Sequence, residues 1–184
     1  LYEIWCFIEV SHIVREQLHL DSDDIEHRNR MEMNGIFSWE LGKGEHSRIL
    51  FRKDGVELAE LVYNPKTDEQ TNDHVGMKDL VVPTVPQKPD IVLQLAKNDL
   101  LQGMKMTYLF DAKYRIYDKE QDVDVPPDDA INQMHRYRDA IYYKDYDAKA
   151  LKKEVIGGYI LFPGDGKPSD VAVSKFYKTI KEVN

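Results

Sequence analysis

The second half of the chain contains Met106-Thr107-Tyr108-Leu109-Phe110-Asp111-Ala112-Lys113, an apolar run that ends in charged residues. Its aromatic and apolar side chains predict a β-strand, and the shorter apolar run Asp90–Leu95 predicts another strand upstream. A polar loop separates the two runs, so we expect them to pair as an antiparallel hairpin. With a symmetrical register, Leu95 faces Met106 near the loop.

At the other end of the same register, Asp90 faces Asp111. Opposite side chains of an antiparallel pair have Cβ atoms about 4.5–5.5 Å apart, and like charges there are destabilising unless another group offsets them. A divalent cation would do so, with the Ala112 carbonyl as a further oxygen ligand. Lys113 lies two residues beyond Asp111, so its ammonium group can reach the same place. The competing interpretation is that both acids end their strands in solvent and one of them pairs with Lys113, which is the usual meaning of a lone Asp-x-Lys.

The segment Tyr2–Leu20 has the apolar spacing of an amphipathic helix. One stripe of this helix consists of Phe7, Val10, Val14 and Leu18. Glu3 lies in line with that stripe, where a carboxylate is costly unless it meets a cation or hydrogen-bond donors. We therefore expect Glu3 to point inward.

A second helix is predicted to start at Asp128 and Asp129, which can cap it, and to run to about Tyr143. Its inward side chains would be Ala130, Met134, Tyr137 and Ile141. Gln133 lies four residues before Tyr137, so the two neighbour each other on the flank that faces the sheet. Tyr137 could equally be an ordinary core residue, and Gln133 a residue at the rim.

Three further segments alternate like strands: Phe37–Leu41, Ile49–Arg52 and Val56–Tyr63. The last two are joined by Asp54-Gly55, a hairpin signal. The run Val155–Phe162 predicts a short buried strand, whereas Asn64–Pro89 has no periodicity and forms a long insertion. The order of helix, strands, helix and strand predicts an α/β fold with a mixed central sheet flanked by helices.

The composition predicts one soluble globular domain that spans residues 1–184. Apolar residues make up 42% of the chain and charged residues 32%, which argues against disorder. No apolar run is long enough to cross a membrane, and the single cysteine, Cys6, cannot form an internal disulfide, so we expect a cytoplasmic protein. The net charge of −8 argues against a strongly basic nucleic-acid footprint. Because the first residue is Leu1, we expect these residues to be the C-terminal part of a longer chain.

The paired acids and the lysine resemble the motif of the PD-(D/E)XK nuclease superfamily, which has Pro-Asp on one strand and (Asp/Glu)-x-Lys on the next. Here the motif reads Pro89-Asp90 and then Asp111-Ala112-Lys113. The resemblance implies a restriction-endonuclease-like core of helix, three antiparallel strands, helix and strand (αβββαβ), which agrees with the order of elements above. It also makes Glu3 the glutamate of the first helix.

Two further similarities point to branches of this superfamily. Gln133 and Tyr137 match the Gln-x-x-x-Tyr of the RecB-like branch. The phrases Leu1–Cys6 and Phe110–Arg115 resemble a bacterial restriction-endonuclease-like subgroup.

The activity that the resemblance implies is that of a nuclease that uses Mg²⁺ or Mn²⁺ to hydrolyse phosphodiester bonds of DNA, in restriction, defence or DNA processing. The metal ligands would be Asp90, Asp111, the Ala112 carbonyl and Glu3. Lys113 would orient the attacking water and neutralise developing negative charge. Gln133 and Tyr137 would hold the strand backbone and the nucleic acid near the metal.

Basic side chains near these positions could contact nucleic acid: Arg115, Arg136, Arg138 and Lys144, interleaved with Tyr114, Tyr117, Tyr142 and Tyr143. For any one of them, a solvated surface is the ordinary explanation. DNA is the expected partner. Because the chain is acidic, we expect strong DNA affinity to come from an N-terminal domain or a partner subunit, and cleavage of both strands would suggest a homodimer.

The sequence leaves two other functions open. A nuclease-like fold without activity could act as a binding or assembly module, although every expected polar group is present, and a hydrolase of another phosphate ester could use the same residues. A zinc site at His12, Glu16 and His19 is less well supported than an exposed polar helix face, because no fourth ligand accompanies them. Cys6 lies in an apolar stretch and is expected in the core.

Overall fold

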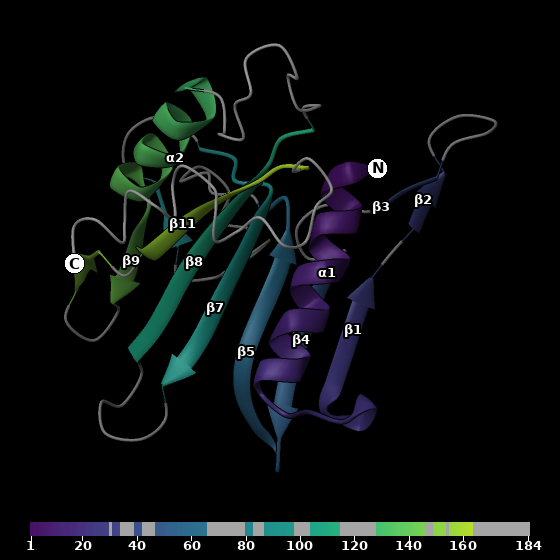
Figure 1. Cartoon of the computed structure of the whole chain (residues 1–184). Helices are drawn as coiled ribbons and strands as arrows, with labels where there is room; N and C mark the ends of the chain where they lie inside the picture. The colour runs from purple at the N-terminus through teal and green to yellow at the C-terminus, as the bar shows by residue number, and fades with distance from the viewer. Residues whose placement is uncertain are drawn as a thin grey trace, which may run out of the picture.

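A six-stranded mixed sheet with a helix on each face forms the centre of the computed structural model (Figure 1). The structure describes residues 1–29, 31–33, 39–41, 47–65, 80–82, 87–97, 104–114, 128–145, 149–153 and 155–163. In spatial order the strands are β1 (Ile25–Asn29), β4 (Ser47–Lys53), β5 (Val56–Tyr63), β7 (Ile91–Lys97), β8 (Met104–Ala112) and β11 (Val155–Leu161). Neighbouring strands are antiparallel except β8 and β11, which are parallel. The predicted α/β class and the mixed sheet are therefore confirmed.

The register between β7 and β8 is the predicted one. Leu95 is opposite Met106, and Ile91 is opposite Phe110 at the far end. The next residues outward from that last pair are Asp90 and Asp111, so the register brings the two acids to the same end of the sheet.

Helix α1 (Tyr2–Gln17) covers one face of the sheet. Its buried side chains Phe7, Val10 and Val14 pack with strand residues such as Leu61 and Ile91. The helix ends at Gln17 rather than at the predicted Leu20. His19 has a φ of 51°, and the backbone amide of Leu20 donates to the Arg15 carbonyl, so the chain turns away there.

Helix α2 (Asp128–Ala140) covers the opposite face. Met134 and Tyr137 pack with Val92 and Leu109, whose side chains point away from α1. The predicted end near Tyr143 is wrong. Tyr142 begins β9 (Tyr142–Asp145), which pairs with β6 (Leu80–Val81) and β10 (Ala150–Lys152) in a three-stranded sheet.

The remaining strand predictions need two corrections. The strand expected at Phe37–Leu41 is β3 (Trp39–Leu41), which pairs with β2 (Met31–Met33) in a separate ribbon, while Phe37 lies outside the described residues. The strand expected to be buried is β11, but it is the last in spatial order among the described strands of the sheet, and Tyr159 is 48% exposed. Within the insertion Asn64–Pro89, Leu80 and Val82 are buried on the α2 face, and residues 66–79 and 83–86 lie outside the described part of the chain.

Gly158 of β11 lies directly against Met134 of α2. A Cβ atom at position 158 would lie 2.7 Å from Met134 Cγ, closer than side-chain atoms pack. We expect Gly158→Ala to lower the free energy of unfolding by about 1–3 kcal/mol through overpacking, as measured by urea denaturation. In a Met134→Ala background the same substitution should cost less by about 0.5 kcal/mol or more. If Gly158→Ala lowers the free energy of unfolding equally in both backgrounds, a side chain at position 158 does not contact Met134.

Candidate active site

Asp90 joins the ends of three neighbouring strands. Its Oδ2 accepts a hydrogen bond of 2.7 Å from the backbone amide of Ala112, at the end of β8. Its carbonyl accepts one of 2.6 Å from the backbone amide of Asn64, just beyond β5. The backbone amide of Lys113 in turn donates to Leu161 of β11 at 2.8 Å. These bonds fix the backbone around both acids, so the carboxylates do not depend on a free loop for their position.

Asp111 is a buried carboxylate whose described partner is a lysine. The Lys113 Nζ lies 2.7 Å from Asp111 Oδ2, with side-chain exposures of 25% for the lysine and 1% for the aspartate. Within the described residues, neither carboxylate oxygen of Asp111 accepts a hydrogen bond, so the ion pair is the contact that the structure gives it. Burial of a carboxylate whose one described partner is a lysine is costly, and a bound ion is one explanation for such a group.

The pKa of Asp90 is raised to about 6, first because of its burial and then because of the negative charges of Asp111 and Glu3. The amide of Ala112 and the charge of Lys113 oppose this rise. Asp90 is therefore within electrostatic reach of both Asp111 and Glu3, and a cation beside Asp90 would relieve the repulsion that it experiences.

Glu3 reaches this region from the other face of the sheet. Its Oε2 accepts a hydrogen bond of 3.1 Å from the hydroxyl of Tyr63, and the Tyr63 ring packs against Phe7 on the α1 face. Burial and the Glu3 charge raise the pKa of Tyr63. Asp111, by contrast, lies two residues after Leu109 on β8, so its side chain points to the same face of the sheet as Leu109, which packs with α2. Tyr63 was not identified from the sequence, although it is the last residue of the predicted strand Val56–Tyr63.

Gln133 and Tyr137 hold the chain just before Asp90. The Gln133 side-chain amide donates to the hydroxyl of Tyr137, and that hydroxyl donates to the carbonyl of Lys88 at 2.9 Å. Burial, followed by the charge of Asp111, raises the pKa of Tyr137 to about 12, so the hydroxyl stays protonated and can remain a donor. No sequence pattern identified the Lys88 carbonyl as the acceptor.

The donor set suits a hard divalent cation. Asp90 and Asp111 offer carboxylate oxygens, and the Asp111 oxygens are buried without hydrogen-bond donors among the described residues. In the same part of the chain, no three His, Cys, Asp or Glu side chains lie close enough together to hold an ion by themselves. Two carboxylates with several retained waters are, however, the usual way in which Mg²⁺ is bound. The Ala112 carbonyl remains a predicted ligand.

The predicted nucleic-acid contacts differ in their distance from this site. The charge of Arg136 lowers the pKa of Tyr137, so Arg136 lies within electrostatic reach of it. Arg138 and Lys144 are exposed, on α2 and β9 respectively. Arg115 lies outside the described residues, as does Tyr117. Among the predicted aromatic contacts, Tyr114 is exposed, whereas Tyr142 and Tyr143 are half-buried.

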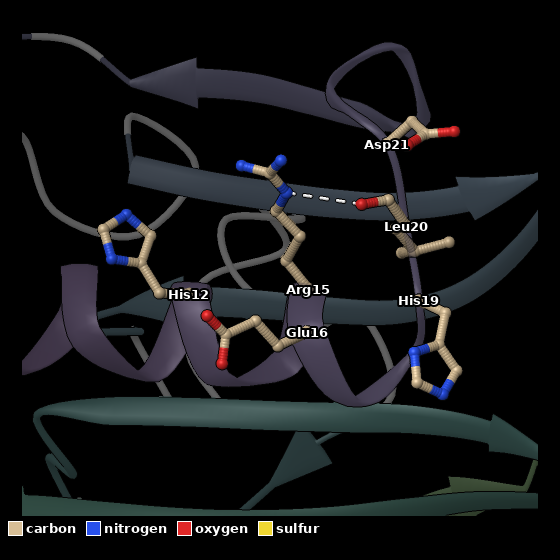
Figure 2. Close-up of a pocket in the computed structure, with 6 residues that line it drawn as sticks. All are labelled: His12, Arg15, Glu16, His19, Leu20 and Asp21. Atoms are coloured by element: carbon tan, nitrogen blue, oxygen red, sulfur yellow. Dashed lines mark hydrogen bonds between the residues drawn. The ribbon is translucent and has the colours of Figure 1, made fainter.

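His12 of α1 and His19, two residues beyond its end, line a hollow of about 600 Å³ (Figure 2). The hollow is lined by His12, Arg15, Glu16, His19, Leu20 and Asp21. Figure 2 shows the rings of His12 and His19 at opposite ends of it, and Arg15 Nε donates to the Leu20 carbonyl at 3.3 Å. Both histidines and Glu16 are exposed, but His19 lies beyond the end of α1, so only His12 and Glu16 belong to the predicted polar helix face.

The raised pKa of Asp90 predicts how the stability of the metal-free protein depends on pH. The folded state binds this proton more tightly than the unfolded state, whose pKa is near 3.8, so stability falls as the pH rises from about 4 to about 6. Asp90→Asn removes this titration. The free energy of unfolding of the variant minus that of wild type should therefore increase as the pH rises across that window. Urea denaturation with a chelator at several pH values measures both proteins. A difference that stays constant with pH would contradict the assignment.

One comparison with known proteins returned a match. The family model of the PD-(D/E)XK nuclease superfamily matches residues 1–167, a range that includes both helices and all six strands of the main sheet. No curated protein and no solved structure matches the chain. In the described part of the chain, no helix is long and apolar enough to cross a membrane.

Proposed function

The chain belongs to the PD-(D/E)XK nuclease superfamily, and on this premise we propose that it is a metal-dependent nuclease that hydrolyses the phosphodiester bonds of DNA. The observation that carries the proposal is the group at the ends of β7 and β8. It consists of two neighbouring acids, one of them buried without hydrogen-bond donors among the described residues, and a lysine paired with the buried acid.

Phosphodiester hydrolysis needs an activated water and stabilisation of the charge that develops on the phosphate. A bound Mg²⁺ or Mn²⁺ would supply both, as a Lewis acid that lowers the pKa of a coordinated water. Asp90 and Asp111 would hold the ion, with the Ala112 carbonyl as a further oxygen. Glu3 would contribute to a second ion or to a bound water from the α1 side. The like charges that raise the pKa of Asp90 support this assignment.

We expect Lys113 to act on the substrate and the attacking water rather than to bind the metal ion. Its ammonium group is already paired with Asp111 and is 25% exposed, so it lies at the border between the buried acid and solvent. From that position it would orient the attacking water and neutralise charge on the phosphate. Gln133 and Tyr137 would act as positioning residues, because they hold the Lys88 carbonyl that precedes Pro89-Asp90. This pair supports a place in the RecB-like branch.

The proposal that the substrate is DNA rests on basic side chains near the site. Arg136 lies near the site and, with Arg138 and Lys144, would contact phosphates, but a chain with a net charge of −8 is poorly suited to bind a polyanion alone. We therefore assign most DNA affinity to a further domain or a partner subunit. We further propose a cytoplasmic role in restriction, defence or DNA processing, with a homodimer as the form that would cleave both strands.

The test compares wild type with Asp111→Ala and Lys113→Ala on plasmid and single-stranded DNA, with Mg²⁺ and with Mn²⁺. Asp139→Ala is the matched control, because Asp139 is an aspartate of α2 whose side chain is 68% exposed. Cleavage by wild type and the control, but not by the two site variants, supports the proposal. Equal cleavage by all four proteins would remove the assignment. Absence of both cleavage and divalent-ion binding would favour a catalytically silent binding module.

A further inference from the structure

An aromatic cluster lies beside Glu3 and Ala112 on the α1 face of the sheet. Tyr2 and Trp5 of α1 are stacked, with ring centroids 5.9 Å apart and planes 21° apart. The ring of Tyr114, just beyond β8, is tilted by 57° against Tyr2 at 5.4 Å. Trp5 is 55% exposed and Tyr114 67% exposed, although large aromatic side chains are usually buried.

These rings line an open hollow that reaches the site. It has a volume of about 620 Å³ and is lined by Leu1, Tyr2, Glu3, Trp5, Ala112 and Tyr114. Glu3 and Ala112 belong to the proposed catalytic group, and Tyr114 follows Lys113 directly in the chain. The N-terminal end of α1 and the C-terminal end of β8 lie at the same end of the molecule (Figure 1).

We propose that Trp5, Tyr2 and Tyr114 form a stacking platform for an unpaired nucleobase next to the phosphate that is cleaved. The inference rests on the proposed nuclease function and narrows its substrate to single-stranded or frayed nucleic acid. Bases in a duplex are stacked on one another and cannot lie on a protein ring, whereas an unpaired base can. The volume of the hollow is within the range of about 300–1,000 Å³ that is usual for small-ligand sites.

The chemistry of the hollow favours a nucleobase over a protein segment. Three of its lining residues, Tyr2, Trp5 and Tyr114, carry flat rings, which stack any of the four bases, and Glu3 adds a polar group to the lining. A protein segment bound there would also cover the end of the hollow at Glu3 and Ala112. Tyr2 is held in place by its hydrogen bond to Cys6, which leaves Trp5 and Tyr114 as the exposed rings that meet the ligand.

The test measures the affinity of the intact protein for a labelled single-stranded oligonucleotide by fluorescence anisotropy, with Ca²⁺ in place of Mg²⁺. A single abasic site is moved along the oligonucleotide. Loss of a stacked base should weaken binding by wild type about 5- to 150-fold at one position. The variant Trp5→Ala/Tyr114→Ala should bind the intact oligonucleotide more weakly by a similar factor and should be insensitive to the abasic site.

Two controls separate stacking from folding. Trp5→Phe keeps a ring and should retain most of the affinity. Ile13→Ala removes an exposed apolar side chain that belongs to the same helix and does not line the hollow, and it should change nothing. An abasic site that has no effect on wild type, or that weakens wild type and the double variant equally, would overturn the platform.

Cleavage in Mn²⁺ is scored separately, so the two proposals can fail independently. Cleavage by wild type without any abasic-site effect would leave the nuclease standing and remove the platform. The position-dependent abasic-site effect without cleavage of any substrate would leave the platform standing and remove the nuclease. If a protein segment occupies the hollow instead, the double variant binds the oligonucleotide as wild type does, and this outcome also overturns the platform.

Discussion

Replacement of Asp111 by asparagine is expected to lower the rate of DNA cleavage by about 10³-fold or more while leaving the metal-free protein folded. Loss of a charged oxygen ligand costs several kcal/mol of transition-state stabilisation, and each 1.36 kcal/mol is a factor of about ten in rate. Asparagine has nearly the same shape, so no cavity forms. The substitution removes a charge that is 1% exposed and has no hydrogen-bond donors among the described residues. The free energy of unfolding should therefore be unchanged or higher by up to about 2 kcal/mol.

Two measurements on the same protein distinguish a catalytic acid from a structural one. Cleavage of plasmid DNA at saturating Mn²⁺ gives the rate, and urea denaturation with a chelator gives the stability. Asp139→Asn, on the exposed surface of α2, should change neither quantity. A fall in stability of more than about 2 kcal/mol for Asp111→Asn would identify Asp111 as a structural acid. Unchanged cleavage would mean that Asp111 does not take part in the reaction.

The position of this acid could be predicted because it depends on local strand geometry. The alternation and the symmetrical register of two apolar runs placed Leu95 opposite Met106, and the structure has that register. That register alone is enough to predict that Asp90 and Asp111 lie at the same end of the sheet. The same reasoning applies to Gln133 and Tyr137, because side chains four residues apart on a helix are neighbours in any helix.

The features that could not be predicted depend on contacts between distant segments. Helix α2 was expected to continue to about Tyr143, but Tyr142 and Tyr143 pair with β6, which lies in a segment without periodicity. Aromatic residues fit a strand well, and the partner that decides between helix and strand is about 60 residues away in the chain. The exposure of β11 was missed for a similar reason: an apolar run does not reveal which distant segments cover its strand.

In the candidate site, too, some features follow from local sequence and others depend on contacts between distant segments. The sequence indicated that Glu3 points inward, and the structure gives it a hydrogen bond to the buried Tyr63. That Glu3 and Asp111 approach the site from opposite faces of the sheet depends on which face each helix covers, and periodicity does not contain this information. The Lys88 carbonyl is a backbone group, so no residue type could have identified it as the acceptor of Tyr137.

The other partner of the ion pair should have the opposite effect on stability. Lys113→Met is expected to lower the free energy of unfolding of the metal-free protein by about 1–3 kcal/mol, because it leaves the Asp111 charge buried without a partner. The full cost of about 3–5 kcal/mol for breaking a buried pair is reduced here, since the lysine is 25% exposed and solvent screens part of the interaction. Cleavage should fall about 10²-fold or more, because the charge that would face the phosphate is lost.

A divalent ion should rescue the stability of Lys113→Met but not its activity. If Asp90 and Asp111 hold the ion, Mn²⁺ at about 100 times its dissociation constant adds about 2.7 kcal/mol to the folded state, which can replace the missing ammonium charge beside Asp111. Lys113→Arg keeps the charge, so it should retain most of the stability. The rate of DNA cleavage by Lys113→Arg should still fall, because a planar guanidinium cannot place a single donor as an ammonium does.

Urea denaturation with and without Mn²⁺ measures the rescue for wild type and both variants. If Lys113→Met is as stable as wild type, or if Mn²⁺ stabilises neither protein, then Asp111 is not the buried charge on which the metal site depends. The two partners of one ion pair therefore differ in the sign of their effect on stability, and no account of the site as a surface salt bridge predicts that difference.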